Sequence, residues 1–146
     1  MGIQQKKPIS GKWRWALACL AIAGCATLTP AQKSYMAKVN AGSTTFRVPK
    51  TQSDIAWQRA QVFVSKYSSM KIQTATNNVL ETFNPGSSDV AFGYSINRLD
   101  NGDSTEFSVS CATGNIFASG NATDNAHICA DYIASGDLPY PNLIRK

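Results

Sequence analysis

The sequence has little of the chemistry from which most active sites are built. Its 146 residues include a single histidine, His127, and two glutamates, Glu81 and Glu106. The patterns of phosphate-binding loops, dinucleotide-binding turns, zinc proteases and serine hydrolases are absent. We therefore expect no cofactor and no metal site, and we assign no catalytic residue. A hydrolase that uses two carboxylates from distant parts of the chain stays an alternative, because such a pair leaves no local pattern.

The surroundings of the single histidine do not change this expectation. Asp124, His127 and Asp131 follow the i, i+3, i+7 spacing that places three side chains on one side of a helix. Three such groups can contact one metal ion, but no further ligand is evident in the sequence. A solvent-exposed helix face with polar pairs is the more ordinary interpretation of this spacing. We therefore expect His127 to be exposed and dispensable.

The sequence also lacks an apolar run long enough to span a bilayer. The longest run, Trp15 to Ala23, has nine residues, whereas a membrane-spanning helix needs about 20. Basic residues precede it, namely Lys6, Lys7, Lys12 and Arg14. A positive segment followed by a short apolar run is typical of an export signal.

The apolar run ends in Ile22-Ala23-Gly24-Cys25. This tetrad resembles the bacterial lipobox, in which an aliphatic residue and two small residues precede the cysteine that receives diacylglycerol. The resemblance implies removal of residues 1–24, lipidation of Cys25 and attachment to a membrane through the lipid. Ala26, in place of Asp, resembles lipoproteins sent to the outer membrane, so we expect the protein on its periplasmic face. The alternative is an ordinary signal peptide whose cleavage site contains a cysteine.

The positive charge of the chain belongs mostly to this signal segment. Four of the 14 lysines and arginines precede Cys25, while all nine aspartates and glutamates follow it. The remaining ten basic residues leave the mature chain with a net charge of +1. A near-neutral chain without a basic patch lacks the electrostatic attraction that nucleic-acid binding requires, so we expect no nucleic-acid partner.

The apolar periodicity predicts one α+β domain over residues 43–146, joined to Cys25 by a tether over residues 25–42. Strands are expected at 44–48, 70–76, 79–84 and 90–97 and after the turn at 101–102, with helices at 51–67 and 121–135. The predicted order is β-α-β-β-β-β-α, an antiparallel sheet of about five strands with two helices packed on one face. A short helix capped by Thr29, with Pro30 at its first position, is an alternative within the tether.

The last two strands have the clearest pattern in the chain. If Asn101 and Gly102 form a two-residue hairpin loop, the expected pairs are Ile96 with Phe107, Tyr94 with Val109, and Phe92 with Cys111. The opposite face would then be polar and made of small residues. We regard it as a candidate interaction face, composed of Gly93, Ser95, Asn97, Ser108 and Ser110.

Two cysteines remain after the signal peptide and the lipid account for Cys19 and Cys25. Cys111 falls on the apolar face of its strand, and Cys129 falls in the apolar stripe of the helix at 121–135. Because both point into the same layer and export leads to an oxidising compartment, we predict a disulfide between them. The alternative is a pair of buried free thiols.

These observations together predict a lipid-anchored envelope lipoprotein that acts as a non-enzymatic binding or structural module. Its expected partners are the membrane, through the lipid, and an envelope protein or cell-wall component. Two alternatives stay open. One is a protein that binds a small ligand or inhibits an enzyme, and the other is the hydrolase with paired carboxylates.

Overall fold

The structure, a computed structural model, describes residues 27–146, so the predicted signal peptide and Cys25 lie outside the described residues. The helices are α1 (Pro30–Ala41), α2 (Ser53–Tyr67) and α3 (Ser119–Ser135), and the strands are β1 (Thr45–Pro49), β2 (Ile72–Ala75), β3 (Val79–Thr82), β4 (Phe92–Asn101) and β5 (Ser104–Thr113). The strands form one antiparallel sheet in the order β1-β5-β4-β3-β2. The predicted α+β class and five-stranded sheet are confirmed.

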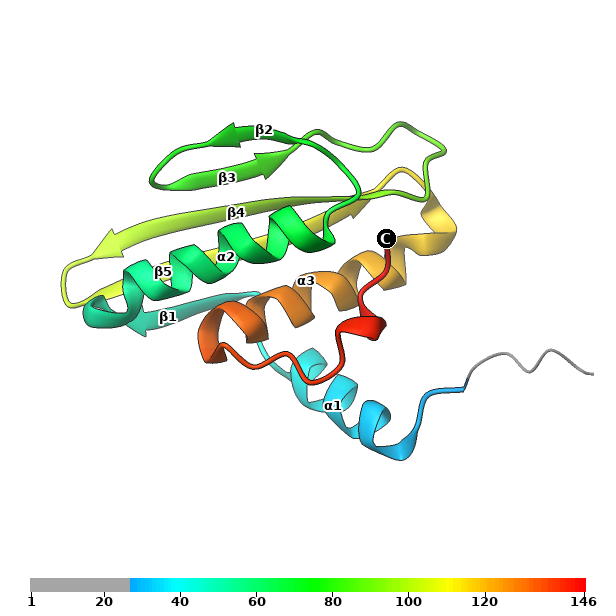
Figure 1. Cartoon of the computed structure of the whole chain (residues 1–146), viewed down its shortest axis with the longest axis horizontal. Helices are drawn as coiled ribbons and strands as arrows, with labels where there is room; N and C mark the ends of the chain where they lie inside the picture. Colours follow the sequence, from blue (N-terminus) through cyan, green and yellow to red (C-terminus); the bar gives the residue numbers. More distant parts are fainter. Residues whose placement is uncertain (1–26) are drawn as a thin grey trace, which may run out of the picture.

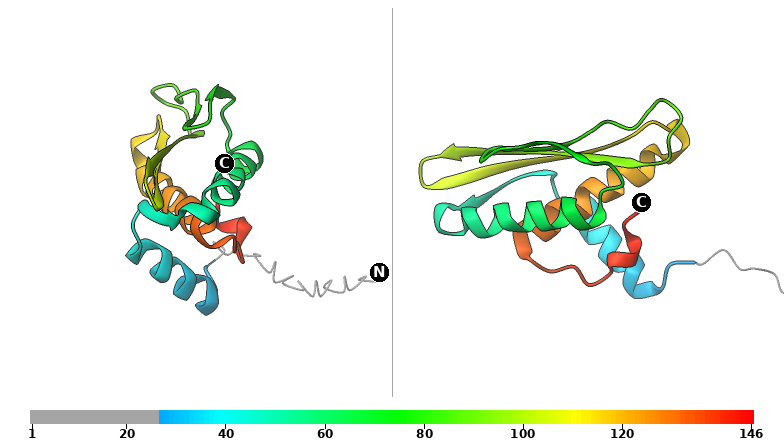
Figure 2. Two further views of the ribbon diagram at one scale, coloured as in Figure 1. Left: turned by 90° about the vertical axis from the view of Figure 1, so that its left-hand side faces the viewer. Right: turned by 45° about the horizontal axis from the view of Figure 1, so that its top comes forward.

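Helices α2 and α3 lie side by side on one face of the sheet (Figures 1 and 2). Both present apolar stripes to the sheet, as the periodicity of the sequence predicts. The fully buried centre of this layer includes Phe63, Tyr94, Ile96, Phe107 and Ile133. Phe63 packs edge-on against Tyr94, with ring centroids 5.5 Å apart. Burial of these large side chains provides the main driving force for folding.

The prediction of two helices is wrong, because α1 is a third helix of the domain, and the alternative of a helix capped by Thr29 with Pro30 at its first position is confirmed. Thr29 and Gln32 form a capping box, in which Thr29 Oγ1 accepts from the Gln32 N–H and Gln32 Oε1 accepts from the Thr29 N–H. Tyr35 and Val39 on α1 belong to the buried core, and α1 packs against α3 (Figure 1). The segment predicted as a tether over 25–42 therefore contains a packed helix.

The predicted register of the β4–β5 hairpin is wrong by two residues. Asn101 pairs with Ser104, so the loop consists of Gly102 and Asp103, with Gly102 at a φ of 71°. The observed pairs are Phe92 with Thr113, Tyr94 with Cys111, and Ile96 with Val109. A shift of two keeps every side chain on its predicted face, because the side-chain period of a strand is two residues.

The predicted helix starts are also wrong in detail. Helix α2 begins at Ser53 rather than at residue 51, and α3 begins at Ser119 rather than at residue 121; their N-caps, Gln52 and Ala118, make no side-chain hydrogen bond. Short 3-10 helices lead into both helices. The predicted end of α3 at Gly136 is confirmed, with Gly136 in the left-handed region at a φ of 80°.

Candidate functional site

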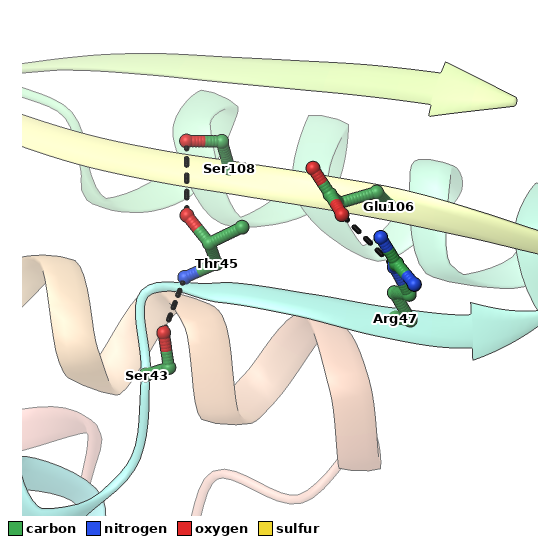
Figure 3. A network of polar contacts seen from close by, with 5 residues as sticks. All are labelled: Ser43, Thr45, Arg47, Glu106 and Ser108. Carbon is green, nitrogen blue, oxygen red and sulfur yellow. Dashed lines mark hydrogen bonds and ion pairs between the residues drawn. The ribbon is translucent and has the colours of Figure 1, made fainter. Parts of the chain in front are cut away.

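One face of the sheet is left uncovered by the helices of residues 27–146 (Figure 2). Asn97, Ser108 and Ser110 are exposed there, and Ser95 is half-buried. Figure 3 shows polar side chains linking β1 to β5 on this face: Arg47 Nε donates to Glu106 Oε2 at 2.9 Å, and the Thr45 and Ser108 hydroxyl oxygens lie 3.4 Å apart. We call this surface the open face.

Gly93 does not contribute to the open face as predicted, because it is buried. A Cβ atom at this position would lie 2.8 Å from the Phe83 carbonyl oxygen and 3.2 Å from Pro85 Cδ. The segment after β3 therefore crosses over Gly93, and the close approach of the two backbones requires a residue without a side chain. The pattern of alternating residues gave no sign of this crossing.

A cavity lies elsewhere in the molecule, between α2, the β2–β3 turn and β4. Its volume is about 520 Å³, and it is lined almost wholly by polar side chains. The lining residues are Asp54, Trp57, Gln58, Gln61, Asn77, Asn78, Arg98 and Asp100. We call it the Arg98 cavity.

Arg98 connects the three walls of this cavity. Its Nη2 donates to Asp54 Oδ1 at 2.7 Å, and its backbone N–H donates to the Asn78 carbonyl at 2.8 Å. Its guanidinium carbon lies 6.0 Å from the centroid of the Trp57 ring, within the range of a cation–π contact. The Arg98 side chain is only 15% exposed, whereas that of Asp54 is 86% exposed. The guanidinium is therefore held in place, and one carboxylate is left open to solvent.

The second carboxylate of the cavity, Asp100, has its own partners. Lys50 forms an ion pair with it, and the Thr105 hydroxyl donates to its Oδ1 at 2.9 Å. These hydrogen bonds, from Lys50 first and Thr105 second, lower the pKa of Asp100. Asp100 thus remains an anion at neutral pH.

The sequence offered only a partial signal for the Arg98 cavity. Asp54, Gln58 and Gln61 follow the i, i+4, i+7 spacing of one polar helix face. Such a face is expected on any surface helix. The turn at Asn77 and Asn78 comes close to this helix face only through the pairing of the strands, and no local pattern predicts that contact.

His127 is not on an exposed helix face as predicted. Because α1 packs over this side of α3, Asp124 accepts a hydrogen bond from Asn40 Nδ2 at 2.8 Å, and Asp131 lies 3.5 Å from Lys38 Nζ. His127 borders a cavity of about 220 Å³ between α1, β1 and α3, and its Nδ1 is buried without a hydrogen-bond partner. Within residues 27–146, no three His, Cys, Asp or Glu side chains are grouped closely enough to hold a metal ion.

Cys111 and Cys129 are free thiols in the structure, so the predicted disulfide is not formed there. Burial raises the pKa of Cys111 to about 12. Burial, followed by the charge of a Cys111 thiolate, raises the pKa of Cys129. The two residues lie on β5 and α3, which pack against each other. The Tyr94 hydroxyl nearby is buried without a hydrogen-bond partner.

No protein-family model, curated protein or solved structure matches this chain. In the part of the chain that the structure describes, no helix has the length and apolar character needed to cross a membrane.

Proposed function

We propose that the protein is a lipid-anchored, non-enzymatic component of the bacterial envelope whose domain binds a small polar ligand in the Arg98 cavity. The anchor is inferred from Ile22-Ala23-Gly24-Cys25. The observation that carries the binding function is the cavity of about 520 Å³ in which amide groups, an arginine and two carboxylates converge. This volume falls within the range typical of small-ligand sites.

The lining of the cavity suits a ligand rich in hydroxyl and amide groups. The side-chain amides of Gln58, Gln61, Asn77 and Asn78 each offer both donors and an acceptor. Arg98 and Asp54 add one charge of each sign. The glycan and short peptides of the bacterial cell wall carry hydroxyl, amide, carboxylate and amine groups together. We therefore propose cell-wall fragments as the ligand class.

The charges in the cavity favour binding over hydrolysis. Hydrolysis by two carboxylates needs one of them protonated as a general acid, which requires a raised pKa. The pKa of Asp100 is instead lowered by its hydrogen bonds, and Asp54 is paired with Arg98. This pairing supports a role for both carboxylates in holding a ligand.

Trp57 provides the readout for a binding experiment. It borders the cavity and is the only tryptophan after Cys25. Titration of the detergent-extracted protein with a soluble disaccharide-peptide from the cell wall should shift the Trp57 emission. Gln61→Ala should weaken binding about fivefold, because one hydrogen bond contributes about 1 kcal/mol.

Gln73→Ala is the matched control, since Gln73 is exposed on β2 and does not line the cavity. It should bind like the unsubstituted protein. Equal weakening in both variants, or an unchanged Trp57 emission at millimolar fragment, would contradict the assignment of the cavity as the binding site.

The open face supports a second candidate function, the docking of an envelope protein. The observation that favours it is an uncovered face on which exposed Leu99 lies beside Glu106 and half-buried Val79 lies beside Asn97. Ser95→Arg combined with Ser108→Arg should then abolish crosslinking to that protein in intact envelopes while the domain stays folded. Unchanged crosslinking would discard the open face as a docking surface.

A further inference from the structure

Most of the exposed large apolar side chains gather at the end of the sheet where β3 and β5 end and β4 begins. They are Ile72, Phe83, Val90, Ile116 and Phe117; we call this group the apolar end. Contacts between the segments hold it together: the Phe83 N–H donates to the Lys71 carbonyl at 2.9 Å, and the Thr113 hydroxyl donates to the Asp89 carbonyl at 3.2 Å.

Ile116 and Phe117 are the most exposed members of this group, at 79% and 93%. They belong to a 3-10 turn, Ile116–Ala118, that leads directly into α3. Asn115 Oδ1 accepts from the Phe117 N–H at 2.9 Å, which fixes the turn. The two side chains are thus held outward by ordered backbone. Clustered apolar side chains of this kind mark surfaces that contact a protein or a membrane.

The described chain begins at the same end of the molecule. In Figure 1 the start of the coloured chain and the segment before α3 both lie at the right-hand end of the long axis, and the right view of Figure 2 agrees. Leu28 and Asn121, in the first turn of α3, line one small cavity. Cys25 precedes Leu28 by three residues, which span at most about 11 Å. A lipid on Cys25 would therefore hold the apolar end close to a membrane.

We propose that the apolar end docks on the bilayer in which the lipid of Cys25 is anchored, with Ile116 and Phe117 inserted among the lipids. This inference rests on the lipid anchoring proposed above. Apolar and aromatic side chains bind the boundary between headgroups and acyl chains, and the chain start lies at the same end of the long axis as the segment that carries Ile116 and Phe117 (Figure 1). The residues that line the Arg98 cavity lie at the opposite end of the sheet, towards the β4–β5 turn, and therefore far from the proposed membrane contact (Figure 1).

Fluorescence quenching by lipid tests this orientation. The full-length lipidated protein, with Phe117→Trp, is reconstituted into phosphatidylcholine vesicles with brominated acyl chains, which quench tryptophan on contact. Leu99→Trp is the matched control, because Leu99 is 59% exposed and lies near the far end of β4. Trp57 is buried and supplies the common background.

The Phe117→Trp protein should show blue-shifted emission, and brominated vesicles should quench most of the fluorescence that this substitution adds to that of Trp57. The fluorescence that the Leu99→Trp substitution adds should not be quenched. Equal quenching of the two variants would overturn the docking. A blue shift without quenching at residue 117 would also overturn it and would place a protein on the apolar end. Vesicle flotation reports the anchor separately: a protein that does not float contradicts lipid anchoring, whereas one that floats without selective quenching contradicts docking alone.

Discussion

At the scale of single residues, the end of α3 depends on one backbone conformation and one side chain. The Gly136 N–H donates to the Tyr132 carbonyl at 2.8 Å, with Gly136 at a φ of 80°. Arg59 crosses over this end, and its Nη1 donates to the Ile133 and Ala134 carbonyls at 3.1 and 3.2 Å. A Cβ atom at residue 136 would lie 2.6 Å from Arg59 Nη2.

Gly136→Ala should therefore lower the free energy of unfolding by at least about 1–2 kcal/mol, the cost of a left-handed conformation for a residue with a Cβ. Displacement of Arg59 adds to this cost. Urea unfolding followed by circular dichroism measures the change.

The control is Gly120→Ala, because Gly120 lies in the first turn of α3 and a Cβ there meets no atom within 4 Å. This substitution should leave stability unchanged or raise it by up to about 1 kcal/mol, since alanine favours helix. A Gly136→Ala protein as stable as the Gly120→Ala protein would contradict the strain at residue 136.

At the scale of elements, α1 packs on the domain through its buried side chains Tyr35 and Val39. Tyr35 is buried and packs edge-on against Tyr140, with ring centroids 5.5 Å apart. Tyr35→Ala should lower the free energy of unfolding by about 3 kcal/mol, as truncation of a buried aromatic side chain does. Urea unfolding gives the value.

Lys33→Ala provides the comparison within the same helix, because Lys33 is exposed. Its effect should stay within about 0.5 kcal/mol. If both variants were equally stable, α1 would be dispensable, as a simple tether is.

A second prediction at this scale concerns the contact between β5 and α3. We predict a Cys111–Cys129 disulfide in the exported protein. Cys129 is buried and Cys111 is half-buried, on elements that pack together, and 17 residues separate them along the chain. Closing a loop of about this length should raise the free energy of unfolding by about 3 kcal/mol. Urea unfolding with and without reductant measures the difference.

Digestion without reductant identifies the linked peptides. The protein must be unfolded before alkylation, because burial raises the pKa of Cys111 to about 12 and the reactive thiolate is then scarce at pH 8. Alkylation of both cysteines in unfolded, unreduced protein would show free thiols and contradict the bond.

At the scale of the whole molecule, the proposed location of the protein rests on the lipidation of Cys25, which precedes the described residues. Cys25→Ser should release the protein from the membrane, since firm anchoring requires more than one acyl chain and the substitution removes the site of all of them. Fractionation and intact mass of the extracted protein measure this, with Cys19→Ser as the control. An unmodified N-terminus in the unsubstituted protein would refute lipidation.

The sequence by itself determined which face each residue of β4 and β5 presents. Tyr94 and Ile96 alternate with Ser95 and Asn97, and this period of two is a property of the strand alone. The five strands, the α+β class and the end of α3 at Gly136 followed from such local signals.

Only the tertiary structure decided the features that depend on contact between distant segments. The observed β4–β5 register differs from the predicted one by two residues, since Tyr94 pairs with Cys111 and not with Val109. Alternation of apolar and polar residues cannot distinguish registers that keep the same faces. Helix α1 buries chiefly Tyr35 and Val39, too few for a clear apolar period, and its packing against α3 covers His127. The Arg98 cavity joins α2, a turn and β4, and chain folding alone brings these three segments together.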